Sequence, residues 1–256
     1  MPLDDDTPAL RLFALLELIA SKDVFVSLPS LVLETGLPKP TLHRMLSQLE
    51  GAGLLTRQAD GRHYGVGVRV RRFAEDLLLN STQHGARHAV LRALVDELGE
   101  SGNITALSGN EIVYLERVET SEPLRFHLHP GSRVPVHCSA SGKMILSQMT
   151  PSQRRNLLAH APLPRHTPNT LVDLEDLEAE LDHVRAAGYA VDNEEFLPGL
   201  VCVAVLVPSG SGRSNLCVAV QAPALRLPSQ TAPDLLPALG RAASAIAEIE
   251  HEGATP

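Results

Sequence analysis

The start of the chain contains two short stretches whose apolar residues recur at helical spacing. In residues 9–21 the apolar positions follow an i, i+3, i+4, i+7 pattern, which predicts an amphipathic helix. Residues 27–35 predict a second, shorter helix with Ser27 as its N-cap. Gly36 then offers the left-handed backbone conformation that commonly ends a helix. The pattern therefore predicts two helices followed by a tight turn.

The next segment, GLPKPTLHRMLSQLEGAGLL (residues 36–55), predicts a third and longer helix. We expect it to begin at Pro40 with Lys39 as its N-cap, because a proline at the first helical position loses no hydrogen bond. Its apolar stripe is made of Leu42, Met45, Leu46 and Leu49. The polar residues on the other side are Thr41, Arg44, Ser47 and Gln48, with His43 at the edge. The helix is expected to bury one side and present basic and hydroxyl groups on the other.

After residue 51 the pattern changes to two short extended segments around Asp60-Gly61, a dipeptide typical of tight β-hairpins. Helix, short helix, turn, longer helix and hairpin follow one another as in a winged helix-turn-helix, whose longer helix enters the major groove of DNA. We therefore expect residues 1–67 to form a DNA-binding domain. The alternative is an ordinary helical domain whose polar face is merely solvated.

The rest of the chain alternates between helical and extended patterns. Residues 68–98 are helical in pattern with a soft break near 80–85, so we expect a linker helix at 68–83 and a second domain at 84–256. Extended segments are predicted at 103–109, 111–119, 123–132, 189–196, 200–207 and 215–223. Helices are predicted near 141–149, 151–160, 173–187 and 231–251. This mixture predicts an α+β fold.

Charge is distributed unevenly along the 256 residues, whose formal net charge is -8. Residues 36–72 carry 7 Lys and Arg against 2 Asp and Glu, a local charge of +5. A basic region in an acidic chain predicts a polyanionic partner for that region alone. The side chains we expect to contact double-stranded DNA are Lys39, Thr41, His43, Arg44, Ser47, Arg57, Arg62 and His63.

Other features of the sequence argue against several classes of protein. No apolar run approaches the ~20 residues of a membrane span, and the acidic start is unlike a secretory signal, so we expect a cytoplasmic protein. Its three cysteines form no CxxC pair, which fits a reducing compartment. The chain has no GxGxxG or P-loop motif, and we expect neither a cofactor nor a resident metal.

Several segments, in this order, resemble the IclR family of bacterial transcriptional regulators. They are GLPKPTLHRMLSQLEGAGLL, GSRVPVHCSASGK, LPRHTPNTL and VRAAGYAVDNEEFLPGLVCVAV. The resemblance implies an N-terminal winged helix-turn-helix, a linker helix, and a C-terminal GAF-like effector domain with a curved antiparallel sheet. It also implies a homodimer or a tetramer built as a dimer of dimers, and a response to a small organic acid.

The segment HCSASGKMIL places small residues before a helix whose first N–H groups have no intrahelical partner, so a carboxylate can bind there. By resemblance, Ala140 and Ser141 would donate those amides. The residues we expect in the effector site are Phe126, Ala140, Ser141, Asp192, Cys202, Ala219 and Gln221. Phe126, Cys202 and Ala219 could instead be simple core residues. Where many family members carry small hydroxyl residues on the last strand, this chain has Ala219 and Gln221.

A second hypothesis concerns the histidines of the same region. His127 and His129, two apart on an expected strand, would share a face near His137 and Cys138, which could make a metal- or redox-responsive regulator. An enzyme would need a nucleophile beside a base. Cys138 and His137 are adjacent in sequence and would point to opposite sides of a strand, so we expect no catalytic activity.

Overall fold

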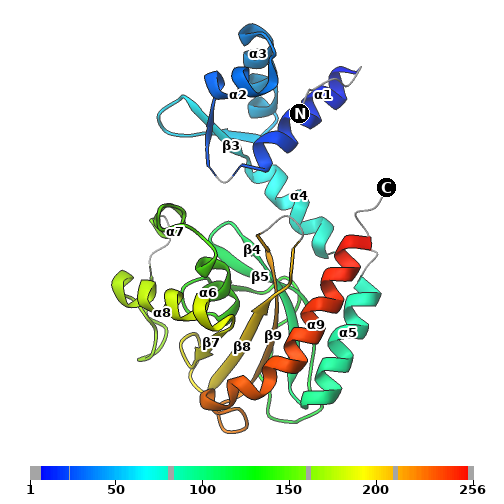
Figure 1. Cartoon of the computed structure of the whole chain (residues 1–256), viewed down its shortest axis with the longest axis vertical. Coiled ribbons are helices and arrows are strands. Elements are labelled where there is room, and N and C mark those ends of the chain that lie inside the picture. The colour runs from blue at the N-terminus through cyan, green and yellow to red at the C-terminus, as the bar shows by residue number, and fades with distance from the viewer. Residues whose placement is uncertain (1–6, 23, 80–83, 160–162, 210–212, 253–256) are drawn as a thin grey trace. The chain divides into compact units, whose positions relative to one another are not determined.

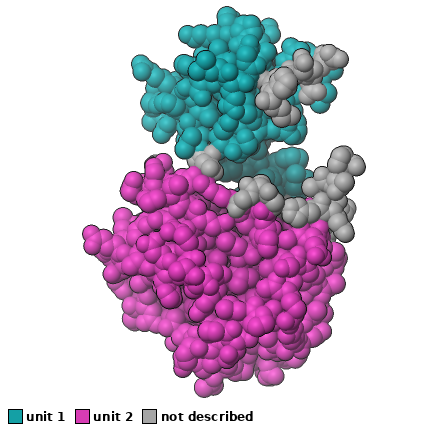
Figure 2. Space-filling model, viewed as in Figure 1, with its two compact units in different colours: residues 1–77 teal, residues 78–256 magenta. Residues whose placement is uncertain are grey.

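The structure is a computed structural model that describes residues 7–22, 24–79, 84–159, 163–209 and 213–252. The chain divides into two compact units, Met1–Leu77 and Leu78–Pro256 (Figure 2). The boundary between them falls inside one helix, α4 (Val68–Leu79). Each unit has a hydrophobic core of its own.

In its described residues, unit 1 contains three helices before α4 and a small antiparallel sheet with the strand order β1-β3-β2. The elements are α1 (Pro8–Ala20), β1 (Val26–Ser27), α2 (Leu28–Thr35), α3 (Lys39–Gly51), β2 (Leu55–Arg57) and β3 (His63–Val66). Leu15, Leu31, Leu42 and Leu46 are fully buried between the helices. The predicted winged helix-turn-helix is confirmed, and β1 adds a strand that the sequence pattern did not predict.

Local interactions fix where the helices of unit 1 begin and end. The Ser27 side chain accepts a hydrogen bond from the Ser30 N–H, and Gly36 has a φ of 70°, so both of these predictions are confirmed. The prediction that Lys39 caps α3 is wrong by one residue. The Pro38 carbonyl accepts the N–H groups of Thr41 and Leu42, so Pro38 is the N-cap and Lys39 is the first helical residue.

The wing is a hairpin formed by β2 and β3. The Asp60 Oδ1 accepts hydrogen bonds from the N–H groups of Arg62 (2.8 Å) and His63 (3.2 Å), and Gly61 adopts a φ of 68°. The Gln58 N–H donates to the His63 carbonyl at 2.8 Å, which closes the loop. Asp60 and Gly61 therefore form the turn as predicted, within a loop longer than the tightest hairpins.

Unit 2 is built on a single antiparallel sheet with the strand order β6-β5-β4-β9-β8-β7. Its strands are β4 (Ser101–Ser108), β5 (Glu111–Val118), β6 (Arg133–Pro135), β7 (Ala190–Asn193), β8 (Leu200–Leu206) and β9 (Leu216–Pro223). Its helices are α5 (His84–Leu98), α6 (Ala140–Ser147), α7 (Pro151–Leu158), α8 (Leu174–Ala187) and α9 (Ala232–Glu252), with a short 3-10 turn η1 (Ser229–Thr231). The curved antiparallel sheet and the α+β class are confirmed.

The two faces of this sheet are covered by different helices. Helices α5 and α9 lie side by side against one face, and α6 with α8 lies against the other (Figure 1). Alternate residues of each strand pack into two separate cores, as the two-residue period of a strand requires. The α6 face also carries most of the polar side chains discussed below.

One predicted strand is absent from the described structure. Residues 123–132 form no strand, and β6 begins only at Arg133. A turn at this point explains the difference. Gly131 has a φ of 88° and donates its N–H to the Tyr114 carbonyl, and the Ser132 N–H donates to the His129 carbonyl. None of the helices in the described ranges is long and apolar enough to span a bilayer.

Candidate functional site: a basic helix face and an enclosed polar cavity

The first surface of interest is the outer side of α3. Lys39, His43, Arg44 and Ser47 are exposed, and Thr41 is half-buried. The apolar stripe beneath them, Leu42, Met45, Leu46 and Leu49, is buried. The helix therefore anchors through one face and presents basic and hydroxyl groups on the other, the arrangement that a recognition helix needs.

The wing residues have different surroundings. Arg57 pairs with Glu50 at 2.5 Å and its guanidinium carbon lies 4.9 Å from the centroid of the Tyr64 ring, so this side chain is already engaged inside unit 1. His63 pairs with Asp60. Arg62 is exposed at the turn. Among the three predicted wing contacts, Arg62 is therefore the side chain best placed to meet a phosphate.

The second feature is a small cavity of about 10 Å³ at the N-terminus of α6. This volume holds about one water molecule, so a ligand can enter only if the walls move apart. The lining residues are Thr105, Ile112, Tyr114, Val134, Ser139, Ala140, Ser141, Asp192, Phe196, Leu200 and Cys202. Four predicted effector residues, Ala140, Ser141, Asp192 and Cys202, are therefore brought together around one space.

The first turn of α6 is arranged to leave its amides available. Within the described residues Ser139 makes no side-chain capping hydrogen bond, and its hydroxyl donates to the Pro135 carbonyl at 2.7 Å. A Cβ at Gly142 would lie 2.0 Å from the Val136 carbonyl oxygen, so only glycine allows this close approach. The uncapped N–H groups and the helix dipole favour an anion at this point.

The other predicted effector residues occupy different places. Ala219 is buried in the core on the α6 face, and Gln221 lies two residues further along β9. The Gln221 Oε1 accepts a hydrogen bond from the Tyr114 hydroxyl at 3.1 Å. Phe126 is half-buried and lines a separate, open recess beside Gly199. Gln221 is thus linked to the cavity wall, and Phe126 lies outside it.

Asp192 supplies the titratable group of the cavity. Burial raises the pKa of Asp192 to about 7, and the Glu195 carboxylate acts in the same direction. The Asp192 Oδ1 accepts the N–H groups of Glu195 (2.8 Å) and Phe196 (3.3 Å), which oppose the shift. Near neutral pH this carboxyl is close to its titration midpoint, and its protonated form can donate a hydrogen bond to an anion.

A buried ion-pair network supports α6, and the sequence pattern did not single it out. The Lys143 Nζ donates to Glu195 at 2.5 Å and to Glu180 at 2.8 Å, and the Lys143 side chain is only 1% exposed. Burial alone would lower the pKa of Lys143, but the two carboxylates outweigh it and the pKa is raised. The network ties α6 to α8 and to the turn after β7, so it holds two cavity walls together.

A larger recess, about 350 Å³ and open to solvent, lies along the edge strand β7. Residues of α8, such as His183, line it together with Tyr189 and Asn193. Among its lining residues in the described part of the chain, no α-helix begins, although Ser229 opens the short η1 turn. The smaller cavity is therefore the better site for an anion, because its walls supply directed donors.

The proposed histidine cluster is not assembled as predicted. His127 is 81% exposed and pairs with Glu119, and the His129 Nδ1 contacts the Pro130 carbonyl. The hypothesis of a His127, His129, His137 and Cys138 site is therefore wrong, because residues 127–129 belong to no strand and lead into a turn.

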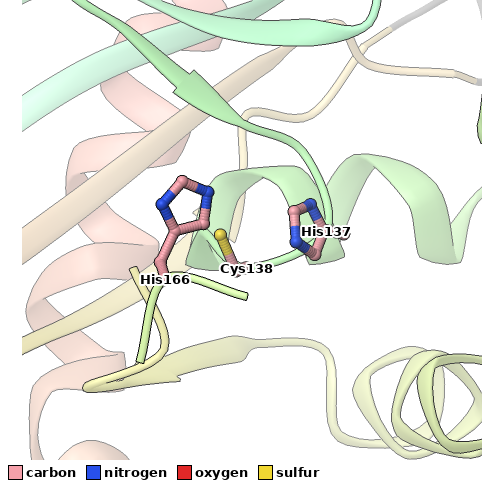
Figure 3. A group of neighbouring side chains, drawn as sticks. All are labelled: His137, Cys138 and His166. Atoms are coloured by element: carbon pink, nitrogen blue, oxygen red, sulfur yellow. The ribbon is translucent and has the colours of Figure 1, made fainter. Parts of the chain in front are cut away.

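The structure instead brings His166 to His137 and Cys138, with their ligand atoms within 4.8 Å of one another (Figure 3). His137 and Cys138 lie in a bend, so the expectation that they point apart is also wrong. The His137 Nε2 contacts the Pro164 carbonyl at 3.1 Å. Burial raises the pKa of the Cys138 thiol and lowers that of His137, so both groups are neutral at pH 7.

A winged helix-turn-helix joined to a unit that encloses a small polar cavity defines a class of protein: a DNA-binding transcriptional regulator. The comparisons agree. Residues 8–59 match the family model described as IclR helix-turn-helix domain, and residues 84–248 match Bacterial transcriptional regulator IclR C-terminal. The chain belongs to the IclR family, whose members are regulators and not enzymes.

Individual relatives share most of their length with this chain. A probable transcriptional regulator SauR of Cupriavidus necator is 45% identical over 86% of this chain and 87% of its own. The transcriptional repressor IclR of Escherichia coli is 29% identical over 83% of this chain and 78% of its own. The solved structure of Thermotoga maritima IclR is 25% identical with a TM-score of 0.62, covering 93% of this chain and 96% of that one.

Proposed function

We propose that this regulator binds a DNA operator as a two-fold homo-oligomer, and that a small organic acid in the cavity of unit 2 changes its affinity for that operator. The observation that carries the proposal is the uncapped N-terminus of α6 facing an enclosed cavity. An acid that bridges the Ala140 and Ser141 amides and Asp192 would be stabilised by donors at both ends.

On the DNA side, Arg44 and Ser47 are proposed to reach base edges in the major groove, with Lys39, Thr41 and His43 beside them. Arg62 is proposed to contact a phosphate from the wing. Arg57 and His63, already paired with Glu50 and Asp60, are proposed to contribute less. A regulator that binds DNA inside a bacterial cell acts in the cytoplasm, which is the location proposed for this protein.

The proposed oligomer is a homodimer, or a tetramer made of two dimers. Two helices of unit 1 expose large apolar side chains that a monomer would leave in water: Leu10 and Phe13 on α1, and Phe73 and Leu77 on α4. A single winged helix also reads too few base pairs for useful specificity, so paired half-sites are expected. A monomer at micromolar concentration in light scattering, both free and on DNA, would contradict this architecture.

The acid-binding part is tested by calorimetry and by gel shift on the native operator with a panel of short organic acids. Ser141→Pro removes one cavity amide at the second position of α6, where proline is tolerated. We expect it to weaken acid binding about ten-fold or more, with operator affinity in the absence of acid unchanged. Ser152→Pro removes the amide at the second position of α7, where the side chain is exposed, and should leave acid binding intact.

If no acid in the panel binds or shifts operator affinity, the proposed response to an acid is wrong, while DNA binding by unit 1 stands or falls separately. If Ser141→Pro and Ser152→Pro lose the same amount of acid affinity, the amides of α6 do not bind the ligand.

A further inference from the structure

An irregularity in the sheet turns one arginine toward the cavity side. Thr105 faces α6, since its hydroxyl donates to the Ser141 Oγ at 2.8 Å. In the pairing of β4 with β5, Thr105 lies opposite Tyr114, but Asn103 lies opposite Arg117 because the register shifts between Ile104 and Thr105. Regular alternation from Tyr114 would have brought residue 116 to this face; the shift brings Arg117 instead.

The position of the neighbouring residue, Glu116, supports this orientation of the Arg117 side chain. Glu116 contacts His88 of α5, on the opposite face of the sheet. Arg117 therefore lies on the α6 face together with Asn103, Thr105 and Tyr114. It also interacts electrostatically with Tyr114 and Cys202, both of which line the cavity.

The Arg117 guanidinium is buried, with 2% of the side chain exposed, and it is only partly paired. Its Nη2 donates to the Phe126 carbonyl at 2.7 Å, and its Nε lies 3.6 Å from the Glu119 carboxylate. That carboxylate is also bound by Arg125 at 3.0 Å and His127 at 3.2 Å. Within the described residues the Arg117 Nη1 has no hydrogen-bond partner.

A second donor of the same cluster is also unpaired. The Gln221 Oε1 accepts from Tyr114 and, at 3.4 Å, from Asn103, which leaves the Gln221 Nε2 without a partner among the described residues. Buried donors without acceptors are rare in folded proteins. Arg117 Nη1 and Gln221 Nε2 are thus two buried donors, one of them charged, without a partner among the described residues, and the Asn103 Oδ1 of the same sheet face is a buried acceptor without a donor.

We infer that the effector carries two anionic groups: one bound by the amides at the N-terminus of α6, and a second bound by the Arg117 Nη1 and the Gln221 Nε2. This inference rests on the proposed function and narrows its ligand to a short diacid. The cavity of about 10 Å³ has to widen to admit the ligand, and neither Arg117 nor Gln221 is among its lining residues, so the second anionic group extends beyond the present cavity. An acceptor with a full charge suits both donors.

The test compares matched acids on the full-length protein by calorimetry: malonate against propionate, and succinate against butyrate. At least one diacid should bind about 10- to 100-fold more tightly than its matched monoacid, the range expected for a hydrogen bond between charged groups. Arg117→Gln should remove this preference by weakening the diacid alone. Arg125→Gln, which removes an exposed guanidinium from the same Glu119 carboxylate, should retain it.

A second variant is included because misfolding of Arg117→Gln would also abolish ligand binding. Gln221→Glu adds a carboxylate to the sheet face that carries Arg117, so it should repel the second anionic group while monoacid binding persists. Diacids that bind no better than monoacids in the wild type would overturn the inference, as would an unchanged preference in Arg117→Gln. If neither kind of acid binds, the proposed function itself fails; if only monoacids bind, the Arg117 inference alone fails.

Discussion

The two units place their functional polar groups in opposite environments. On α3 of unit 1, His43, Arg44 and Ser47 are exposed above a buried apolar stripe. In unit 2, Lys143, Asp192 and Gln221 are each at most 2% exposed. Exposed charges act on a large external polyanion and are screened by salt, whereas buried groups must find partners inside the protein or on a ligand.

This difference separates how the two units respond to change. Removing an exposed side chain of α3 is expected to remove one proposed contact to DNA and to leave the fold intact. Removing one of the buried polar side chains leaves its partner without a hydrogen bond or counter-charge in a low-dielectric interior. Both the free energy of unfolding and the ligand specificity should therefore change. The following variants test that contrast, beginning with the largest expected effect.

Replacing Lys143 by methionine should have the largest effect on stability. The substitution leaves Glu195 and Glu180 without their cation, and breaking a buried pair in this way costs about 3–5 kcal/mol of unfolding free energy. The control is Lys22→Met in unit 1, whose partner Glu34 is a third exposed, and there about 0–1 kcal/mol is expected. Urea unfolding of both variants measures the difference; similar losses would refute the contrast.

The pH dependence of stability should report Asp192. Because burial raises its pKa to about 7 from an ordinary value of 3.8, the folded state keeps a proton that the unfolded state loses. The stabilisation from this proton is complete below about pH 4 and is lost as the pH rises through 7, with a slope of at most about 1.4 kcal/mol per pH unit.

Asp192→Asn should remove that component of the slope between pH 5 and 7, as measured by urea unfolding at several pH values. The groups that share this environment are Glu195, Lys143 and the thiols of Cys138 and Cys202. If wild type and Asp192→Asn show the same slope, the carboxyl does not titrate in this range.

Much of unit 1 could be predicted from the sequence because its signals are local. Ser27 caps a residue three positions away, Gly36 ends the same helix by its own backbone conformation, and Asp60 binds the two N–H groups just beyond the turn. Lys39 was misplaced by one residue because two prolines flank it and either can begin a helix.

The cavity of unit 2 was only partly predictable, because its chemistry depends on long-range pairing. Ala140 and Ser141 follow from the local helix-start pattern, whereas Arg117 reaches the α6 face only through a shift in register against β4. The Lys143 Nζ pairs with Glu180 and Glu195, which lie 37 and 52 residues further along the chain. His166 lies close to Cys138 but belongs to a separate loop. For Arg117 the available signal was the charged pair Glu116-Arg117 directly after the apolar run 112–115.

Arg44→Ala should weaken operator binding by about 1–3 kcal/mol if the guanidinium reads a base, and relax specificity at that position. Unit 2 should be unaffected, so acid binding should equal that of the wild type. Arg241→Ala removes an exposed guanidinium from α9 and is the matched control. Unchanged affinity of Arg44→Ala in a gel-shift titration on the native operator would exclude this role.

The smallest expected effect compares two arginines of the wing. Arg62 is exposed at the turn, so Arg62→Ala should weaken binding to operator and random DNA alike and reduce the slope of log affinity against log salt by about 1. Arg57 is held by Glu50 and lies over Tyr64, so Arg57→Ala should change the salt slope by less than Arg62→Ala does. Titrations at three or more salt concentrations measure both slopes. A larger change for Arg57 would mean that its ion pair with Glu50 opens on DNA, and that exposed and internally paired charges of unit 1 contribute alike.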